Sequence, residues 1–485
     1  MTIDPILRSF ELLARRDPLA PLVVSPERRA TAGDVAALAR AAGSVVGLAA
    51  GCPPPPGSAV GLAAGNGPGF LASLLALLRA GFAAILMDSL TPEAENLRIL
   101  QALGAPALLR CRTGWPSSPE DWSWTETPPG GVLPLLLPGT AVVKLTSGST
   151  GTPRGIATSA EALLADDAAL TATMGIRPDD RLLATIPLSH SYGLSSLALP
   201  ALLRGAVLAT PEEGNAYDPF ATAWRTGATV FPTVPAYLDA LVRVGDPPER
   251  PPSLRLVLIA GAPLSAATSR RFHDTFGLPI HVFYGASECG GICYDREGGA
   301  AERGTVGSPV EGVRVTLAPV PGGNPGEGQV TVSSPAVACG YLPDGDASLA
   351  DGTFTAGDLA AWEGGELALR GRLDGLVNIK GKKVNPREVE AILGQLAGVD
   401  EAVVLGVSRP GRPDQILRAV VACRPGRLSA GDVTAWCRER LAAHKVPRSV
   451  ILVPEIPRTS RGKLDHPALA ALRALGPPGA DDGHG

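Results

Sequence analysis

The chain has 485 residues, of which 45% are hydrophobic and 19% are charged, so it can supply a large core and is not globally disordered. Its formal net charge is −4 and only 4% of its residues are aromatic. With no basic excess and few stacking side chains, a dedicated nucleic-acid binder is excluded. The 58 glycines and 47 prolines follow no period, which excludes a collagen-like structure.

Strands and helices alternate along most of the chain. Residues 58–88 combine a short apolar run, a helical pattern that ends at Gly81 and a second apolar run, which predicts a β-α-β unit of a parallel sheet. The same order recurs over residues 228–244 and 254–285. We therefore expect an α/β fold with a large N-terminal domain of doubly wound mixed sheets.

The pattern changes in three places after this beginning. Residues 113–140 are rich in Pro, Ser and acidic side chains and predict a surface excursion without an element. Short apolar runs after residue 310 predict a small antiparallel β unit. Helix starts at Asn385 and Ser429, the second expected to run to Ala443, and three strand-like runs predict a small α+β C-terminal domain. The expected domains are 1–372 and 375–475, followed by a disordered tail, 476–485.

No targeting or membrane signal is visible. The N-terminus lacks a basic start followed by an apolar run, and the longest apolar stretch, residues 74–87, is too short to cross a bilayer. Seven cysteines do not suggest a disulfide framework. Cys289 and Cys293 have no histidine or second cysteine pair nearby, so we interpret them as buried thiols in preference to a zinc site. We expect a cytoplasmic protein with no membrane span.

Lysine is scarce, because only six lysines stand among the 43 basic residues. Where arginine is the default cation, a retained lysine suggests that a compact ammonium is needed in place of a planar fork. The competing interpretations are chance and, for the group at 380–383, a solvated loop. The six are Lys144, Lys380, Lys382, Lys383, Lys445 and Lys463.

The strongest local signal is LTSGSTGTPRGI, residues 145–156, which follows the strand-like AVVKL. Three glycines, the four hydroxyl residues Thr146, Ser147, Ser149 and Thr150, and Arg154 can present backbone N–H groups, hydroxyls and one cation to phosphate oxygens. The pattern is neither the Walker sequence nor G-x-G-x-x-G. A flexible Ser/Gly loop is the competing interpretation.

This loop and six later motifs resemble, in order, those of the acyl-adenylate-forming superfamily, which includes the AMP-dependent acyl- and aryl-CoA synthetases. The resemblance extends over nearly the whole chain and implies a large AMP-binding domain followed by a small mobile domain. The six later motifs are IPLSHSYGLS (186–195), LIAGAPLS (258–265), FYGASECGG (283–291), TAGDLAAW (355–362), GRLDGLVNIKGKKVNPREVE (371–390) and PRTSRGKLD (457–465).

The resemblance implies a site that binds ATP and neutralises the charge of the anions brought together there. The loop would hold the β- and γ-phosphates, with Arg154 where many relatives have lysine. Glu288 and Thr150 would hold Mg²⁺. Asp358 would accept hydrogen bonds from the ribose, and Arg372 would pair with the ribose or the α-phosphate. The residues implied to contact the nucleotide are Thr146, Ser147, Gly148, Ser149, Thr150, Gly151, Arg154, Gly261, Ala262, Pro263, Tyr284, Gly285, Asp358 and Arg372.

Three further residues have roles implied by the resemblance. His190 would lie at the mouth of the carboxylate pocket, although a lone histidine is more often structural. Lys463 would bridge the substrate carboxylate and the α-phosphate in the transition state. Asp374 would be the hinge about which the small domain rotates between two reaction steps.

The implied function is a ligase that uses ATP, Mg²⁺ and coenzyme A. A carboxylic acid and ATP give acyl-AMP and pyrophosphate, and a thiol then displaces AMP. The alternatives are a ligase that loads a separate acyl carrier protein and a non-catalytic binding protein that kept the fold. Because Gly290 and Gly291 leave room after Glu288, and LSSLALPALL after His190 is apolar, we expect a neutral hydrophobic acid, fatty or aromatic, with a slight preference for a fatty acid.

Overall fold

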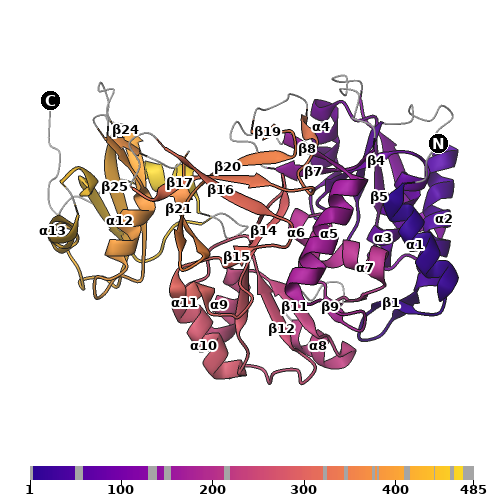
Figure 1. Ribbon diagram of the computed structural model, residues 1–485, viewed down its shortest axis with the longest axis horizontal. Helices are drawn as coiled ribbons and strands as arrows, with labels where there is room; N and C mark the ends of the chain where they lie inside the picture. The colour runs from indigo at the N-terminus through magenta and orange to yellow at the C-terminus, as the bar shows by residue number, and fades with distance from the viewer. Residues whose placement is uncertain are drawn as a thin grey trace, which may run out of the picture. The chain divides into compact units, whose positions relative to one another are not determined.

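The computed structural model describes residues 4–49, 58–128, 139–146, 154–211, 219–320, 325–342, 348–373, 377–379, 382–408, 415–441, 443–458 and 464–472 (Figure 1). The chain divides into two compact units. The first comprises Met1–Thr316, Thr331–Thr355 and Gly364–Leu367, and the second comprises Leu317–Val330, Ala356–Glu363 and Ala368–Gly485. Across the described ranges, no helix has both the length and the apolar character needed to cross a membrane.

The first unit contains two large mixed sheets. The nine-stranded sheet has the order β15 (Ser308–Pro309), β14 (Gly290–Tyr294), β13 (Ile280–Ala286), β12 (Leu256–Ile259), β11 (Val230–Thr233), β9 (Arg181–Leu183), β10 (Val207–Ala209), β1 (Pro21–Val24) and β2 (Arg29–Thr31). The seven-stranded sheet has the order β18 (Gly340–Leu342), β8 (Arg154–Ser159), β7 (Thr140–Thr146), β4 (Ala83–Met87), β3 (Ala59–Ala63), β5 (Ala107–Cys111) and β6 (Trp122–Glu126). In both, parallel strands form the centre and antiparallel strands the edges, which confirms the expected α/β class.

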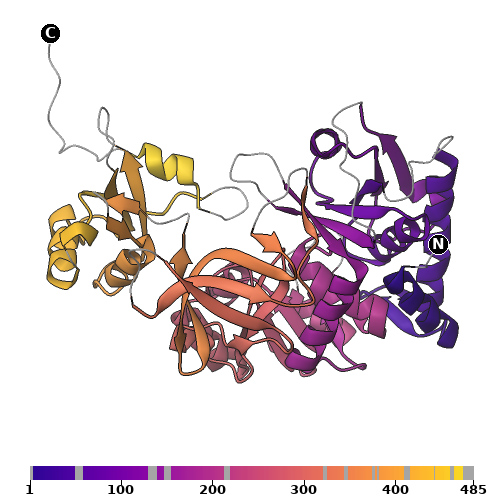
Figure 2. The same cartoon turned by 45° about the horizontal axis from the view of Figure 1, so that its top comes forward.

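Helices connect the parallel strands and cover the sheets. The predicted β-α-β unit is confirmed: α3 (Pro68–Arg79) joins β3 to β4, and its residues up to Leu78 are buried. Figures 1 and 2 show α1 (Pro5–Arg16) and α2 (Ala32–Ala49) beside α3. The other helices of this unit are α4 (Glu93–Leu103), α5 (Ala160–Met174), α6 (Ser191–Gly193), the π-helix η2 (Leu194–Ala198), α7 (Leu199–Arg204), α8 (Pro219–Thr226), α9 (Pro235–Arg243), α10 (Ala266–Phe276) and α11 (Ala300–Arg303).

Residues 113–140 differ from the sequence prediction. Within them, a short 3₁₀ turn (Pro119–Asp121) leads into β6, which pairs antiparallel with β5 at the edge of the seven-stranded sheet. The side chain of Trp122 is only 4% exposed, and its Nε1 donates to Ser73 Oγ at 2.8 Å. The expectation of a surface excursion without an element was therefore wrong, because one buried tryptophan anchors an otherwise polar strand.

The smaller β structures follow the predicted order. A five-stranded sheet has the order β16 (Arg314–Pro319), β17 (Glu327–Ser333), β20 (Thr353–Glu363) and β19 (Leu349–Ala350), with β21 (Glu366–Arg372) also paired to β20. The remaining strands form a hairpin of β22 (Val377–Ile379) and β23 (Lys382–Val384), and a three-stranded sheet of β24 (Glu401–Ser408), β25 (Gln415–Ala422) and β26 (Ser449–Val453).

The helices of the second unit begin where their caps predict. Asn385 caps α12 (Pro386–Leu393), because its Oδ1 accepts the N–H of Arg387 at 3.0 Å. Ser429 and Asp432 form a capping box at α13 (Ala430–Arg440), which ends three residues before the expected Ala443. A 3₁₀ turn (Ala443–Lys445) and α14 (His466–Ala471) complete the unit.

Candidate active site

The expected site residues of the first unit follow the carboxyl ends of parallel strands. In the seven-stranded sheet, β7 ends at Thr146, where the candidate phosphate loop begins. In the nine-stranded sheet, residues 261–263 follow β12, Tyr284 and Gly285 lie near the end of its parallel neighbour β13, and His190 follows β9. Open α/β sheets bind ligands at this edge, so the fold gathers these residues where a ligand site is expected.

Asn66 joins the carboxyl edges of the two large sheets. It follows β3, and its Nδ2 donates to the carbonyl oxygens of Ala184 at 2.8 Å and Ile186 at 2.9 Å. Its Oδ1 accepts the N–H of Leu188 at 2.9 Å. These bonds hold the segment between β9 and His190. Asn66 was not predicted, because its one visible signal was an asparagine at the end of a predicted strand.

Glu288 lies in the turn between β13 and β14 and is held at two points. Its carbonyl oxygen accepts the N–H of Ala338 at 2.8 Å, and its Oε1 accepts the hydroxyl of Tyr341 at 2.9 Å. Both donors belong to the segment that enters β18. Tyr341 was not predicted, since nothing in ACGYL marks a contact 53 residues away in the chain.

The residue before Glu288 is held as well. The carbonyl oxygen of Ser287 accepts Lys144 Nζ at 3.1 Å, and Ser287 Oγ lies 2.7 Å from Ser191 Oγ. Lys144 precedes the phosphate loop on β7, and Ser191 directly follows His190. The turn that carries Glu288 therefore contacts β7, which leads into the phosphate loop, and the segment that contains His190.

Strand register explains why these side chains meet. Lys144 on β7 and Tyr341 on β18 both pair with Ile156 on β8, from opposite sides, and Arg154 pairs with Thr146 two positions further along. Directly opposed residues, and residues two apart on one strand, share a face of the sheet. The Arg154 guanidinium accordingly lies over the Tyr341 ring, 4.1 Å from its centroid.

Lys144 is only 2% exposed. Lysine is unusual in a sheet interior, because burial disfavours its protonated, charged form. Burial lowers the pKa of Lys144, while the negative charges near it, chiefly that of Asp166, oppose the change. Lysine scarcity was the sequence signal that drew attention to Lys144. The structure gives that position a partner, the Ser287 carbonyl.

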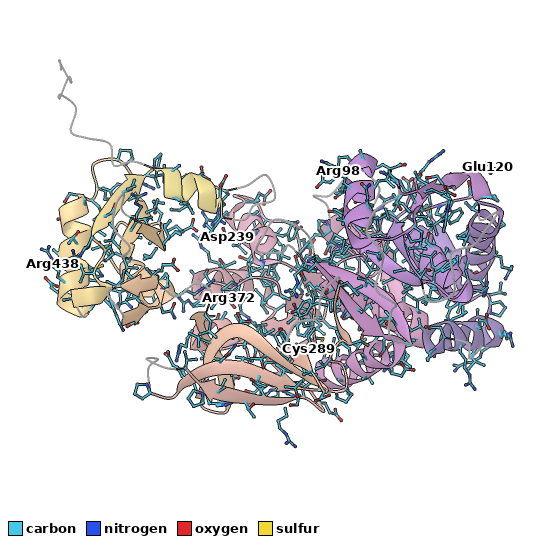
Figure 3. All side chains as sticks on the ribbon, turned by 90° about the horizontal axis from the view of Figure 1, so that it is seen from above. Arg98, Glu120, Asp239, Cys289, Arg372 and Arg438 are labelled. Carbon is cyan, nitrogen blue, oxygen red and sulfur yellow. The ribbon has the colours of Figure 1, made fainter. Side chains whose placement is uncertain are left out.

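Cys289 and Cys293 are buried thiols, as predicted. Cys289 is labelled in Figure 3, and both residues are fully buried. Burial raises the pKa of both thiols, that of Cys293 to about 12, so neither is a thiolate near neutral pH.

The space attributed to Gly290 and Gly291 is occupied. A Cβ at Gly290, whose φ is +70°, would lie 2.2 Å from Asp166 Oδ1, and one at Gly291 would lie 2.6 Å from Leu170 Cδ2. Asp166 also accepts the N–H of Gly291 at 2.9 Å and the hydroxyl of Ser195 at 2.6 Å. The expectation that these glycines leave room for an acid was wrong, because α5 packs directly against them.

The histidine segment has one exposed and one buried part. His190 is exposed and precedes α6, and its carbonyl oxygen accepts the N–H of Leu194 at 2.8 Å. Gly193 fits closely, since a Cβ there would lie 2.0 Å from the carbonyl oxygen of Pro187. The apolar run that follows is part of the main core, so it does not show the polarity of a pocket wall.

The environment of Glu288 suits a magnesium ion. It supplies one half-buried carboxylate, and Mg²⁺ prefers one or two carboxylates combined with phosphate and water oxygens. Within the described ranges, no lysine or arginine forms an ion pair with Glu288, and Tyr341 is the partner of its side-chain hydrogen bond. A closed site of three or more His, Cys, Asp or Glu side chains is not found in the same part of the chain.

The second unit contains Asp358 and Arg372, the residues expected to meet the ribose. They lie on the paired strands β20 and β21, and Arg372 Nη1 is 3.9 Å from Asp358 Oδ1. The N–H of Leu373 donates to the carbonyl oxygen of Gly357 at 2.6 Å. This bond joins the two strands directly beside Arg372 and Asp358. The structure thus places both predicted side chains in one ion pair.

Several predicted site residues lie outside the described residues. They comprise most of the phosphate loop, the hinge residue and the catalytic lysine: Ser147, Gly148, Ser149, Thr150, Gly151, Asp374 and Lys463.

Two family models match the chain. The model described as AMP-binding enzyme matches residues 10–342, and the model described as AMP-binding enzyme C-terminal domain matches residues 388–463. A feruloyl-CoA synthase from an Amycolatopsis species is 32% identical over 435 residues, covering 82% of this chain and 85% of that protein. A 3-[(3aS,4S,7aS)-7a-methyl-1,5-dioxo-octahydro-1H-inden-4-yl]propanoyl:CoA ligase from Mycobacterium tuberculosis is 29% identical over 453 residues, with 83% and 86% covered.

A solved structure agrees in fold. O-succinylbenzoate coenzyme A synthetase from Bacillus subtilis, in complex with AMP, superposes with a TM-score of 0.78 over 96% of this chain and 98% of that chain, at 22% sequence identity. The mixed sheets followed by a smaller β-containing domain are therefore an arrangement already known from solved proteins.

Proposed function

The chain belongs to the AMP-binding enzyme family and is an AMP-forming acid–CoA ligase, and we propose that it activates a hydrophobic, ring-bearing carboxylic acid. The observation that carries the assignment of its site is the meeting of Arg154 and Glu288 at Tyr341, at the carboxyl edge of the seven-stranded sheet. A cation beside a phosphate loop and a carboxylate for a metal are the two charges that a nucleoside triphosphate site needs.

The reaction has two steps. In the first, a carboxylate oxygen of the acid attacks the α-phosphorus of ATP, a P–O bond forms, and the bond to the departing pyrophosphate breaks. In the second, the sulfur of coenzyme A attacks the acyl carbon, the C–O bond to AMP breaks, and the thiol proton is released. The products are AMP, pyrophosphate and a thioester.

Each site residue has a role that follows from its charge. Arg154 and the hydroxyls of the phosphate loop would bind the β- and γ-phosphates, and Glu288, with Thr150, would hold magnesium. Magnesium, when bound, would supply positive charge to the phosphates. Lys463 would lie between the carboxylate and the α-phosphate, and His190, exposed ahead of α6, would contact the acid.

In the second unit, Asp358 would accept hydrogen bonds from the ribose hydroxyls. Arg372, already paired with it at 3.9 Å, would add a donor for the ribose or the α-phosphate. Residues 261–263 and Tyr284 would line the base and sugar side of the site, since they follow neighbouring parallel strands.

Two relatives support the class of acid. Their names contain a feruloyl group and an octahydroindenyl-propanoyl group, and both groups have a ring that carries a chain ending in the activated carboxyl group. The sequence slightly favoured a fatty acid over an aromatic one, but its two grounds, the glycines after Glu288 and the apolar run after His190, belong to the packed core. A ring-bearing acid is therefore favoured.

The same names favour coenzyme A over a carrier protein as acceptor. The test is to supply the purified chain with ATP, Mg²⁺ and a panel of phenylpropanoid, indane-propanoate and fatty acids, and to measure pyrophosphate release and thioester formation. We expect pyrophosphate with ring-bearing acids and thioester when coenzyme A is added. Glu288→Gln should lower pyrophosphate release sharply while the protein stays folded. Absence of pyrophosphate with every acid would contradict the proposal.

A further inference from the structure

Two charged side chains of the candidate site meet at Tyr341. The Arg154 guanidinium carbon lies 4.1 Å from the centroid of its ring, and its hydroxyl donates to Glu288 Oε1 at 2.9 Å. The face of a tyrosine ring attracts a cation, while the phenol hydroxyl donates to an anion. One side chain therefore contacts a cation and an anion at two separate places.

The surrounding strands leave this side chain little freedom. β18 pairs antiparallel with β8, and Tyr341 is opposite Ile156, which places Arg154 diagonally across on the same face. The N–H of Ala338, three residues earlier, donates to the carbonyl oxygen of Glu288 at 2.8 Å. The segment from Ala338 to Tyr341 thus holds both the backbone and the carboxylate of Glu288.

We propose that Tyr341 is a positioning residue that sets the distance between the cation beside the phosphate loop and the carboxylate that holds magnesium. This inference rests on the proposed function, in which Arg154 meets phosphate and Glu288 meets the metal. Tyr341 acts through these two neighbours and takes no part in bond making. Its ring positions the Arg154 guanidinium, and its hydroxyl positions the Glu288 carboxylate. The two effects can therefore be separated by substitution.

Tyr341→Phe keeps the ring and removes the hydroxyl, whereas Tyr341→Leu removes both. A hydrogen bond to a charged group at a partly exposed site corresponds to about tenfold in affinity. A cation–π contact at such a site corresponds to about three- to fivefold. The phenylalanine variant should therefore affect metal-dependent binding alone, and the leucine variant should also affect binding of the nucleotide without metal.

The experiment measures ATP binding by isothermal titration calorimetry without acid or coenzyme A, once with saturating Mg²⁺ and once with EDTA. We expect Tyr341→Phe to bind ATP within about twofold of the unsubstituted protein in EDTA, and about tenfold more weakly with Mg²⁺. Tyr341→Leu should be about three- to fivefold weaker in EDTA as well.

Thr229→Val is the matched control. It removes another hydroxyl-to-carboxylate hydrogen bond of the same unit, from Thr229 Oγ1 to Asp180 Oδ1 at 2.6 Å, at the amino end of β11. Both ATP affinities should be unchanged in this variant, even if its melting temperature falls. If Tyr341→Leu does not fold, Tyr341→Met takes its place, because methionine keeps more side-chain volume without a π face.

The inference is overturned if Tyr341→Phe keeps the full benefit of Mg²⁺, or if removal of the ring leaves ATP binding in EDTA unchanged. These results differ from failure of the proposed function. In that case the unsubstituted protein would not bind ATP, or Glu288→Gln would respond to Mg²⁺ as the unsubstituted protein does.

Discussion

Gly290 shows how a single residue can be fixed by its neighbours. Its φ of +70° belongs to the left-handed region, and α5 places Asp166 where a β-carbon would project. Two separate costs therefore oppose a side chain at this position, one from the backbone and one from the contact. A second glycine allows the two to be measured apart: Gly312 has a φ of +74°, and no atom lies within 4 Å of the position that a β-carbon would take there.

We predict that Gly290→Ala destabilises the protein more than Gly312→Ala. The backbone cost alone should be about 1 kcal/mol at Gly312, and the added contact should bring the loss at Gly290 to about 3 kcal/mol. Urea unfolding of both variants, followed by tryptophan fluorescence, measures the difference. Equal losses would mean that Asp166 moves aside at no cost.

Lys463 carries the sharpest prediction about chemistry at a single residue. A carboxylate and an α-phosphate must approach within bonding distance, and a positioned ammonium stabilises the charge shared between them. Removal of one such group typically costs on the order of 10²–10³ in rate. Lys463→Ala should therefore suppress acyl-AMP formation by that order, yet convert supplied acyl-AMP and coenzyme A to thioester at a near-normal rate.

The measurement is both half-reactions on one purified variant. Equal loss in the two would indicate a general folding or binding defect. Loss in neither would mean that Lys463 is a solvated loop residue.

Between elements, Asn66 is the clearest structural connection of the site. It follows β3 in one sheet and binds three backbone groups that follow β9 in the other, so it fixes the distance between two carboxyl edges. The segment it holds leads directly to His190. Loss of its amide should therefore weaken binding of the acid more than binding of the nucleotide.

We predict that Asn66→Ala raises the KM for the acid several-fold and changes the KM for ATP by less than about twofold, since three bonds of about 1 kcal/mol each are lost beside His190 alone. Asn96→Ala is the control, because Asn96 is a buried asparagine of α4 that donates to the Thr91 carbonyl oxygen at 3.3 Å. It should lose stability without changing either KM. If Asn66→Ala raised both KM values equally, the role assigned to Asn66 in acid binding would be wrong.

The contact between α5 and α7 predicts a dependence of stability on pH. Asp167 is 2% exposed, and burial raises the pKa of its carboxyl to about 6, although the paired Arg204, 2.7 Å away, opposes the shift. The folded state therefore binds this proton more tightly than the unfolded state does. The resulting stabilisation is fully present below about pH 4 and is lost as pH rises through 6.

We expect the free energy of unfolding of Asp167→Asn to lack this slope. Relative to the unsubstituted protein, the variant should gain stability between pH 4.5 and 7, by about 1–3 kcal/mol in total. Unfolding in urea at a series of pH values tests this. A difference between the two proteins that does not vary over that range would show that Asp167 keeps an ordinary pKa when folded.

At the scale of the whole molecule, the expected division into a large and a small domain would give a physical basis for a reaction in two steps. The expected boundary, with domains at 1–372 and 375–475, stays a prediction, and its hinge residue, Asp374, directly follows Leu373, the last residue of the described range 348–373. We propose that the small domain rotates about Asp374 between acyl-AMP formation and thioester formation.

Asp374→Pro should fix φ near −65° and hinder that rotation. We predict that acyl-AMP still forms while thioester formation slows at least tenfold, whereas Asp374→Ala, which removes the same carboxylate without restricting φ, keeps both rates. Single-turnover assays of each half-reaction give the answer. A proline variant that slows both steps equally would show that the hinge lies elsewhere.

The amino-acid sequence by itself determined the order of elements and the motifs. The β-α-β unit of 58–88, the caps at Asn385 and Ser429, and the phosphate loop are local patterns, readable because periodicity, capping and glycine content act within a few residues. The strand β6 was not predicted, because its composition is mostly polar. Its buried residue Trp122 donates a hydrogen bond to Ser73 of α3, 49 residues away.

Only the tertiary structure decided which further residues contact the segments of the candidate site. Asn66, Lys144 and Tyr341 contact partners 122, 143 and 53 residues away along the chain, distances over which a sequence pattern carries no signal. It also decided against the space assigned to Gly290 and Gly291, since a missing side chain leaves a cavity only where no neighbour fills it. Here α5 fills it, because close packing rather than composition sets the free volume of an interior.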